Sequence, residues 1–372
     1  MTYLIRQLLF LTVALVCVAG DEDFETRLYR AQQHLYDAKY EIAARELMIL
    51  SKEYSYQPGG PFFHAMAYLW QLGFRPDDTQ LITNAITLLK NAHNRANHSL
   101  NSNAKNPEML FWRGISTGVI TVCEVLLETS PEQRNPNIFS SILGRFRALD
   151  KFRLMQNDLQ LSLNYNPELI DSHLGLALYG LYSGRNKQKG IEQLWSVIDK
   201  GKYLKTEASY LLVDFLYGQG SHDDLLYRAI PINLGLSMQY SDNLLFQLAL
   251  AKLYYEIENF DGAESVLVQL LNDSSRPYHN LISNEAHYFL GTIAFNKEKY
   301  SMAIEHFEHI FASNPRLPDY LIPWTYFRSA QCHWRLGNIP IARKLLEKTL
   351  GADNVNGVHF EANNLLKELA KK

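Results

Sequence analysis

Alanines recur at a regular interval in the C-terminal half of the sequence, and this spacing constrains the fold more than any other feature. Ala229, Ala263, Ala303 and Ala342 follow one another at intervals of about 34 to 40 residues, the length of a two-helix repeat. Around each alanine, apolar residues are spaced three and four apart, as is typical of helices. A small side chain lets two helices approach closely where they cross. The sequence therefore predicts a stack of helix pairs.

The stretch AHYFLGTIAFNKEKYSMAIEHF contains one complete pair. Gly291 and Ala303 are expected where its two helices cross, because small residues allow close backbone contact. Tyr300 and Phe307 are expected to fill the space beside that crossing. Pro315 follows the second helix and prevents it from continuing. This pattern resembles the tetratricopeptide repeat, a helix–turn–helix unit of about 34 residues.

The resemblance implies an all-α fold: a right-handed α-solenoid of antiparallel helix pairs. We expect an N-terminal repeat over 21–57, a degenerate helical-repeat region over 58–209, further repeats over 210–356 and a capping helix over 357–372. Within the degenerate region, residues 94–106 are predicted to form a polar loop. That loop contains an N-glycosylation sequon at Asn97, and a second sequon begins at Asn272.

The first twenty residues have the parts of a secretory signal peptide. Arg6 supplies the positive end, an apolar run covers 8–18, and small residues precede an acidic stretch at residue 21. Residues 1–20 are therefore predicted to be a signal peptide, with an uncleaved anchor as the alternative. Ala14 and Val16 do not fit the bacterial lipoprotein motif, so lipid attachment at Cys17 is not expected. The protein is expected to be exported, either periplasmic or secreted, without a membrane span after cleavage.

Two stretches, DSHLGLALYG and GIEQLWSVIDKG, make the whole chain similar to a loose group of exported bacterial tetratricopeptide proteins. This resemblance implies architecture and export, and it carries no catalytic motif. The net charge of −3 and the dispersed lysines and arginines argue against a nucleic-acid partner. Cys123 and Cys332 are expected to be buried free thiols, because they would lie too far apart in an elongated stack to form a disulfide.

Two short motifs suggest catalysis, and neither has the expected context. GISTG, from Gly114 to Gly118, fits the nucleophile elbow around Ser116, but that motif needs a strand and a parallel sheet. His306 and His309 are one helical turn apart and could bind a metal, but no third ligand is evident. A solvated helix face is the favoured explanation, because charged residues are expected on the outward face of a second helix in any case. We therefore expect no enzyme activity, no cofactor and no metal.

Stacked repeats curve and leave a concave surface lined by the first helix of each pair. The resemblance to tetratricopeptide repeats implies that particular positions of each first helix face a partner there. We expect this inner wall to be open to a guest, with Trp334 and Arg335 as its strongest contacts. The predicted partner-binding residues are Lys252, Tyr255, Glu256, Tyr288, Phe295, Asn296, Trp324, Phe327, Gln331, Trp334 and Arg335.

Three functional hypotheses follow. The first is an exported scaffold without enzyme activity that binds a protein or peptide through its concave face, with cell-envelope assembly or maintenance as one setting. The second is a small-ligand or lipid-binding solenoid, in which the aromatic stretch PFFHAMAYLW would line an apolar cavity. The third is a hydrolase accessory built around Ser116 or the pair of His306 and His309.

Overall fold

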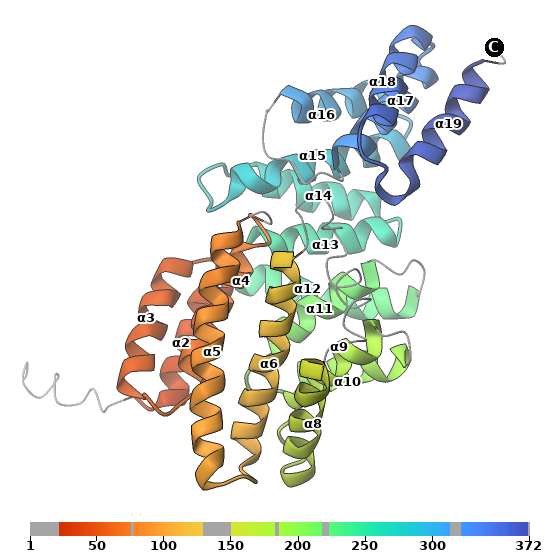
Figure 1. The fold of residues 1–372 in the computed structure, drawn as a ribbon. Helices are drawn as coiled ribbons and strands as arrows, with labels where there is room; N and C mark the ends of the chain where they lie inside the picture. The colour runs from red at the N-terminus through yellow and green to blue at the C-terminus, as the bar shows by residue number, and fades with distance from the viewer. Residues whose placement is uncertain are drawn as a thin grey trace, which may run out of the picture.

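The computed structural model describes residues 22–75, 78–128, 150–182, 186–217, 223–312 and 321–370. Helices fill most of these segments, which contain no strand, so the predicted all-α class is confirmed. Figure 1 shows that α2 to α12 form one body, from which α13 to α19 extend toward the C-terminus. The predicted signal peptide, Cys17 and Pro315 lie outside the described residues.

Each helix packs against the next one in the chain, which gives the predicted α-solenoid of helix pairs with a tetratricopeptide-like arrangement. A short 3-10 helix, η2 (Val355–Gly357), precedes the last helix. The helices are α2 (Phe24–Tyr36), α3 (Tyr40–Glu53), α4 (Gly59–Gln71), α5 (Thr79–Ser102), α6 (Pro107–Glu128), α8 (Asp150–Tyr165), α9 (Ser172–Tyr182), α10 (Lys187–Lys200), α11 (Lys205–Tyr217), α12 (Asp223–Gln239), α13 (Leu244–Glu256), α14 (Phe260–Leu271), α15 (His279–Asn296), α16 (Tyr300–Ala312), α17 (Leu321–Arg335), α18 (Ile339–Gly351) and α19 (Val358–Leu369).

The small residues that define the repeat lie at helix crossings, as predicted. Ala263, Ala303 and Ala342 have no solvent-exposed surface. A Cβ atom added to Gly291 would lie 2.5 Å from Cε1 of Phe307, far inside van der Waals contact. The sequence therefore encodes the close approach of α15 and α16 through the absence of a side chain at this position.

Four of the turns inside helix pairs have the same left-handed backbone conformation. Ala38, Glu258, Glu298 and Gly337 each follow the first helix of a pair and have left-handed φ angles of 57°, 59°, 58° and 80°. The N–H of the next residue then donates back across the helix end, as in Lys299 N to Ala294 O at 2.8 Å. This closure ends the first helix and starts the second after a short turn.

The GISTG stretch lies inside α6, which packs between α5 and α8. A Cβ atom on Gly118 would overlap the sulfur of Met155, and one on Gly114 would lie 3.0 Å from Leu159. The two glycines thus allow close packing of α6 on α8. Among the described residues, α6 has the length and apolar composition of a membrane span, but 67% of its most apolar window is buried in the protein.

The predicted polar loop over 94–106 is wrong for residues 94–102, because α5 continues to Ser102 and only residues 103–106 connect it to α6. Ala92, Ala96 and Leu100 are buried and continue the apolar stripe of this helix. Asn97 is exposed on the same helix, and its side-chain oxygen accepts a hydrogen bond from Arg113 Nη1 at 3.0 Å. Residues 94–102 are helical although most of them are polar, because apolar residues at every fourth position are enough to give the helix a buried face.

The N-terminal helix pair contacts segments that come about 170 to 210 residues later in the chain. A simple repeat stack does not predict this contact, because each repeat there packs only on its neighbours. Gln32 Nε2 donates to Tyr203 O at 2.9 Å, and Asn243 Nδ2 donates to Tyr36 O at 2.8 Å. The rings of Trp70 on α4 and Phe246 on α13 pack edge to face at 5.5 Å. The chain is therefore closed on itself between α2–α4 and α11–α13.

The C-terminal end is capped as predicted. Val358, Ala362, Leu365 and Leu369 form the buried face of α19 and pack against α17 and α18. The predicted thiols are also confirmed, since Cys123 and Cys332 are both buried and unoxidised. Burial raises the pKa of each thiol to about 12, which disfavours the reactive thiolate.

Candidate partner-binding surface

The first helices of three successive pairs lie side by side, because α13 contacts α15 and α15 contacts α17. We call the surface that they share the A-helix wall. All eleven predicted partner-binding residues lie on these three helices. The wall carries them in three groups: near the end of α13, along α15, and along α17.

One end of this wall is covered by the protein's own chain, which corrects the expectation of an inner wall open along its length. Leu245 and Leu248 at the start of α13 are buried. A Cβ atom on Gly73, just after α4, would lie 2.6 Å from Leu245 Cδ1, so this turn sits directly on α13. The accessible part of α13 therefore begins near Lys252, which is partly exposed.

Lys252 and Tyr255 join α13 to α15 through contacts with defined geometry. The Lys252 ammonium lies 2.5 Å from Glu285 Oε1 and 5.6 Å from the centroid of the Phe289 ring. Tyr255 packs edge to face on the same ring at 5.7 Å, and Asn296 Nδ2 donates to its hydroxyl at 3.3 Å. Glu285 and Phe289 were not predicted, although Glu285 lies one turn before Tyr288 on the same helix face.

Carboxyl groups at this end of the wall are partly desolvated. Burial raises the pKa of Asp214, on α11, to about 6, and the positive charge of Lys252 opposes that rise. Burial also raises the pKa of Glu256. Because burial penalises the charged form, both carboxyl groups hold a proton more readily than exposed carboxyl groups do.

Arg328 organises the second group, between α15 and α17, and the sequence did not identify it. Its guanidinium carbon lies 5.7 Å from the Phe295 ring centroid and 5.8 Å from that of Trp324. Its Nη1 atom donates to Gln331 Oε1 at 3.0 Å, while its Nε atom is buried without a partner. The arginine thus connects three of the predicted residues through its planar face and its edge.

Phe327 belongs to the core and does not face a partner, which corrects its assignment. It is 3% exposed and packs edge to face on Trp324 at 5.6 Å. Trp324 Nε1 in turn donates to Val355 O at 3.1 Å, so this tryptophan anchors the turn that leads into α19. Both aromatic residues hold the capping helix in place.

Tyr288, Trp334 and Arg335 are the remaining predicted residues of the wall. Tyr288 is partly exposed and packs between Phe289 and Phe307, with ring centroids 5.5 and 6.4 Å away. Trp334 is half-buried against the C-terminal core, and the exposed Arg335 guanidinium lies 4.7 Å from its ring centroid. The predicted pair is therefore a half-buried aromatic ring with an exposed positive charge beside it.

The catalytic alternatives lack the geometry that they need. Ser116 has no exposed surface, and its hydroxyl has no hydrogen-bond partner. His306 and His309 both contact a third imidazole, His287, on the neighbouring helix. Even so, no group of three or more His, Cys, Asp or Glu side chains within the described segments is positioned to hold a metal ion.

The apolar-cavity alternative is also weakened. The aromatic stretch at the start of α4 packs tightly, with Phe62 5.3 Å from Phe63 and 5.4 Å from Trp112 between ring centroids. All three side chains are at most 1% exposed. These rings fill the space that a lipid or other apolar ligand would need.

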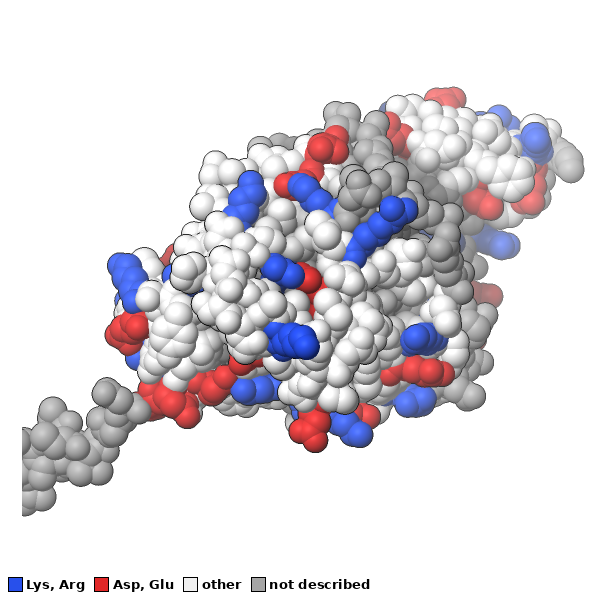
Figure 2. All heavy atoms as spheres, turned by 60° about the horizontal axis from the view of Figure 1, so that its bottom comes forward, with Lys and Arg blue, Asp and Glu red and all other residues white. Residues whose placement is uncertain are grey.

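Surface charge is mixed on the face drawn in Figure 2, where basic and acidic side chains alternate in small groups. No broad field of one sign covers the described part of that face. This distribution fits the net charge of −3 and gives no electrostatic footprint for a long polyanion there.

No family model matches the chain, and no curated protein matches its sequence. Among solved structures it is similar to a human IFIT1 dimer with m7Gppp-AAAA, at 12% identity and a TM-score of 0.49, covering 94% of this chain and 86% of that one. An IFIT1 monomeric mutant with Gppp-AAAA gives 11% identity, a TM-score of 0.48 and the same coverage. A human IFIT1 dimer with PPP-AAAA gives 14% identity and a TM-score of 0.35, covering 84% of this chain and 68% of that one. At these values no property of IFIT1 is transferred to this chain.

Proposed function

We propose that this protein is an exported scaffold that binds a protein or peptide partner along the A-helix wall and catalyses no reaction. The observation that supports this most is the combination of aromatic and polar groups on α15 and α17, where Phe295, Arg328 and Gln331 are all partly exposed. Such a surface offers apolar contact area together with donors and acceptors for a partner's backbone.

The position of the wall limits the size of the partner. Its α13 end is closed by α4, and its α17 end is bounded by the capping helix α19. A short extended peptide or one helix fits between these two boundaries better than a large globular surface. Export, and a role in cell-envelope assembly or maintenance, rest on the sequence of residues 1–20 and on the resemblance to exported tetratricopeptide proteins.

Site-specific photocrosslinking tests the binding surface. A photoreactive amino acid at Asn296, which is exposed on the wall, should give a defined adduct in the native compartment. The same group at Lys344, exposed on α18, is the matched control and should give none. Alanine replacement of both Trp334 and Arg335 should remove the adduct without changing the helical circular dichroism. Equal adducts from positions 296 and 344 would exclude the wall as the binding surface.

Export has a separate and direct test. The mature protein from its natural source should begin at residue 21, because signal cleavage is predicted after the small residues at 18–20. Mass spectrometry of the purified protein's N-terminal peptide measures this. A mature chain that keeps residues 1–20 and fractionates with the cell interior would contradict export while leaving the binding proposal intact.

A further inference from the structure

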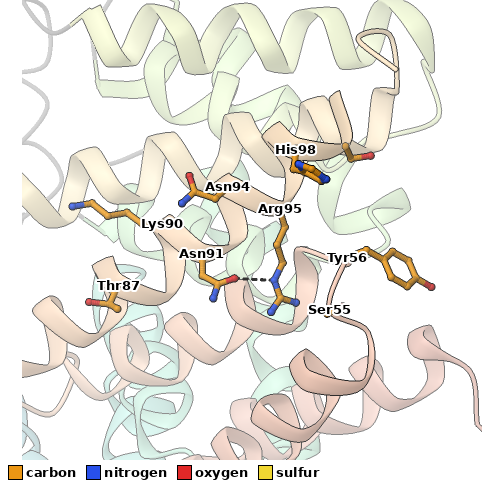
Figure 3. A pocket seen from close by; sticks show the side chains of 9 residues that line it. Ser55, Tyr56, Thr87, Lys90, Asn91, Asn94, Arg95 and His98 are labelled. Atoms are coloured by element: carbon orange, nitrogen blue, oxygen red, sulfur yellow. Dashed lines mark hydrogen bonds between the residues drawn. The ribbon is translucent and has the colours of Figure 1, made fainter. Parts of the chain in front are cut away.

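A polar groove lies away from the A-helix wall, between α5 and the turn that follows α3 (Figure 3). It has a volume of about 520 Å³, which is within the range of small-molecule sites. Its lining residues are Ser55, Tyr56, Thr87, Lys90, Asn91, Asn94, Arg95, His98 and Ser99. None of these nine side chains is acidic.

The charge of Arg95 in this groove is not balanced by a carboxylate among its hydrogen-bond partners. Arg95 Nη1 donates to Tyr54 O at 3.2 Å and to Gln57 O at 3.0 Å, and Nε donates to Asn91 Oδ1 at 2.8 Å. All three acceptors are neutral oxygens. The bonds hold the guanidinium in a fixed position while leaving its positive charge available to an anion.

The sequence of α5 adds to the positive charge of this groove. The helix, Thr79–Ser102, contains no Asp or Glu, in a protein whose net charge is −3. Lys90 and His98 are exposed and line the same groove as Arg95, and they lie eight residues or about 12 Å apart along the helix axis. In Figure 3, Lys90, Arg95 and His98 project from the same helix, and Tyr56 comes from the separate segment that follows α3.

We propose that this groove binds a small phosphate-bearing ligand. A phosphate group carries up to two negative charges and three acceptor oxygens, so it can engage Lys90 and Arg95 together. The amides of Asn91 and Asn94 supply further hydrogen bonds to phosphate or hydroxyl oxygens. Tyr56 is 67% exposed, and its ring offers an apolar face to the organic part of a phosphate ester.

Isothermal titration calorimetry with pyrophosphate and with ADP as probes tests the site. We expect dissociation constants below about 1 mM at low salt for at least one probe. The double variant K90A/H98A should weaken binding at least about fivefold, which corresponds to about 1 kcal/mol. Both replaced side chains are exposed, so the fold should not suffer, and K344A is the matched loss of a distant exposed cation.

The two probes distinguish the source of the phosphate. Equal affinities would show that the inorganic group alone is recognised, whereas tighter ADP binding that Y56A abolishes would show recognition of an organic ester. Absence of binding of both probes at 10 mM, about ten times the expected upper limit, would overturn the proposal. Binding that K90A/H98A leaves unchanged, or that K344A weakens equally, would also overturn it.

Discussion

The Nδ1 atoms of His287 and His306 lie 3.0 Å apart across the contact between α15 and α16. His309 packs against the same His287 ring at a tilt of 32°, with centroids 3.9 Å apart. One ring nitrogen of the close pair must donate and the other accept, so at most one of the two imidazoles can be protonated without repulsion. The cluster therefore links the packing of this helix pair to pH.

The first prediction concerns acid stability. Burial, then His309, His306 and His279, lowers the pKa of His287 to about 4. In the unfolded chain a histidine has a pKa near 6.5 and binds the proton more readily. The contribution of His287 to the free energy of unfolding is therefore fully present above about pH 6.5 and is lost as the pH drops toward 4. H287Q should remove about 1 kcal/mol of this loss, a figure reduced for partial solvent exposure.

Thermal unfolding of wild type and H287Q at pH 7.5 and pH 4.5 measures this effect. Neighbouring carboxylates affect the same cluster, because burial lowers the pKa of His306 and the charge of Glu305 opposes that change. The comparison of two proteins at each pH cancels the titration of groups outside this histidine cluster. An identical acid loss in both proteins would contradict a role for His287.

The second prediction concerns the left-handed turn residues. E258G and E298G should each stabilise the fold by about 0.5 kcal/mol, because glycine adopts this backbone conformation without steric cost. Gly337 is the internal control: its Cβ would meet no atom within 4 Å, so G337A should cost about 1 kcal/mol through the backbone alone. Urea unfolding midpoints measure all three variants, and stabilisation by G337A would refute the explanation.

The third prediction concerns the crossing of α15 and α16. G291A should destabilise the protein by about 1 to 3 kcal/mol, because the added methyl group overlaps the Phe307 ring. F307L removes part of that ring, so the double variant G291A/F307L should be less destabilised than the sum of the single variants. Strict additivity in the double-mutant cycle would show that the two side chains do not compete for the same space.

The fourth prediction concerns Glu207, which accepts the Tyr36 hydroxyl at 2.9 Å on both carboxyl oxygens. Burial raises the pKa of Glu207 to about 7, above the unfolded value near 4.5. Its neutral form is favoured in the fold, so its contribution is complete below about pH 4.5 and is lost as pH rises through 7. The loss is on the order of 3 kcal/mol, and its direction with pH is opposite to that of His287.

E207Q mimics the protonated acid and should therefore gain stability relative to wild type as the pH rises from 5 to 8. Chemical unfolding of both proteins at four pH values in this range measures the difference. Y36F, which removes the donor, should destabilise the protein at every pH in this range. A constant difference between E207Q and wild type across the range would contradict the raised pKa.

The sequence predicts the packing of the helices correctly where one local contact recurs. Gly291, Ala303 and Phe307 meet within one helix pair, so their spacing alone specifies the packing. The all-α class and the solenoid arrangement followed from that recurring contact. The two buried thiols followed from apolar helical patterns in the same way.

Sequence reasoning failed where a contact joins distant segments. Tyr36 and Glu207 come from unrelated parts of the chain, and no periodicity marks their meeting. Phe327 has the position of a partner-facing residue, but the capping helix lies close enough to bury it. Arg328 lies one residue away from the expected face, and its long side chain reaches the aromatic groups from there.

The hydrogen bonds between α2 and residues 203–243 also affect the order in which the chain can fold during its synthesis. In an open repeat protein each unit can settle once its neighbour has formed. Here the hydrogen bond from Gln32 cannot form until Tyr203, 171 residues later, has been synthesised. At ribosomal speeds of 5 to 20 residues per second this is a delay of roughly 10 to 35 s. During that interval Tyr36 and Trp70 lack the surfaces of α11 and α13 that cover them in the folded protein, so helices α2 to α4 expose apolar side chains that a chaperone could protect.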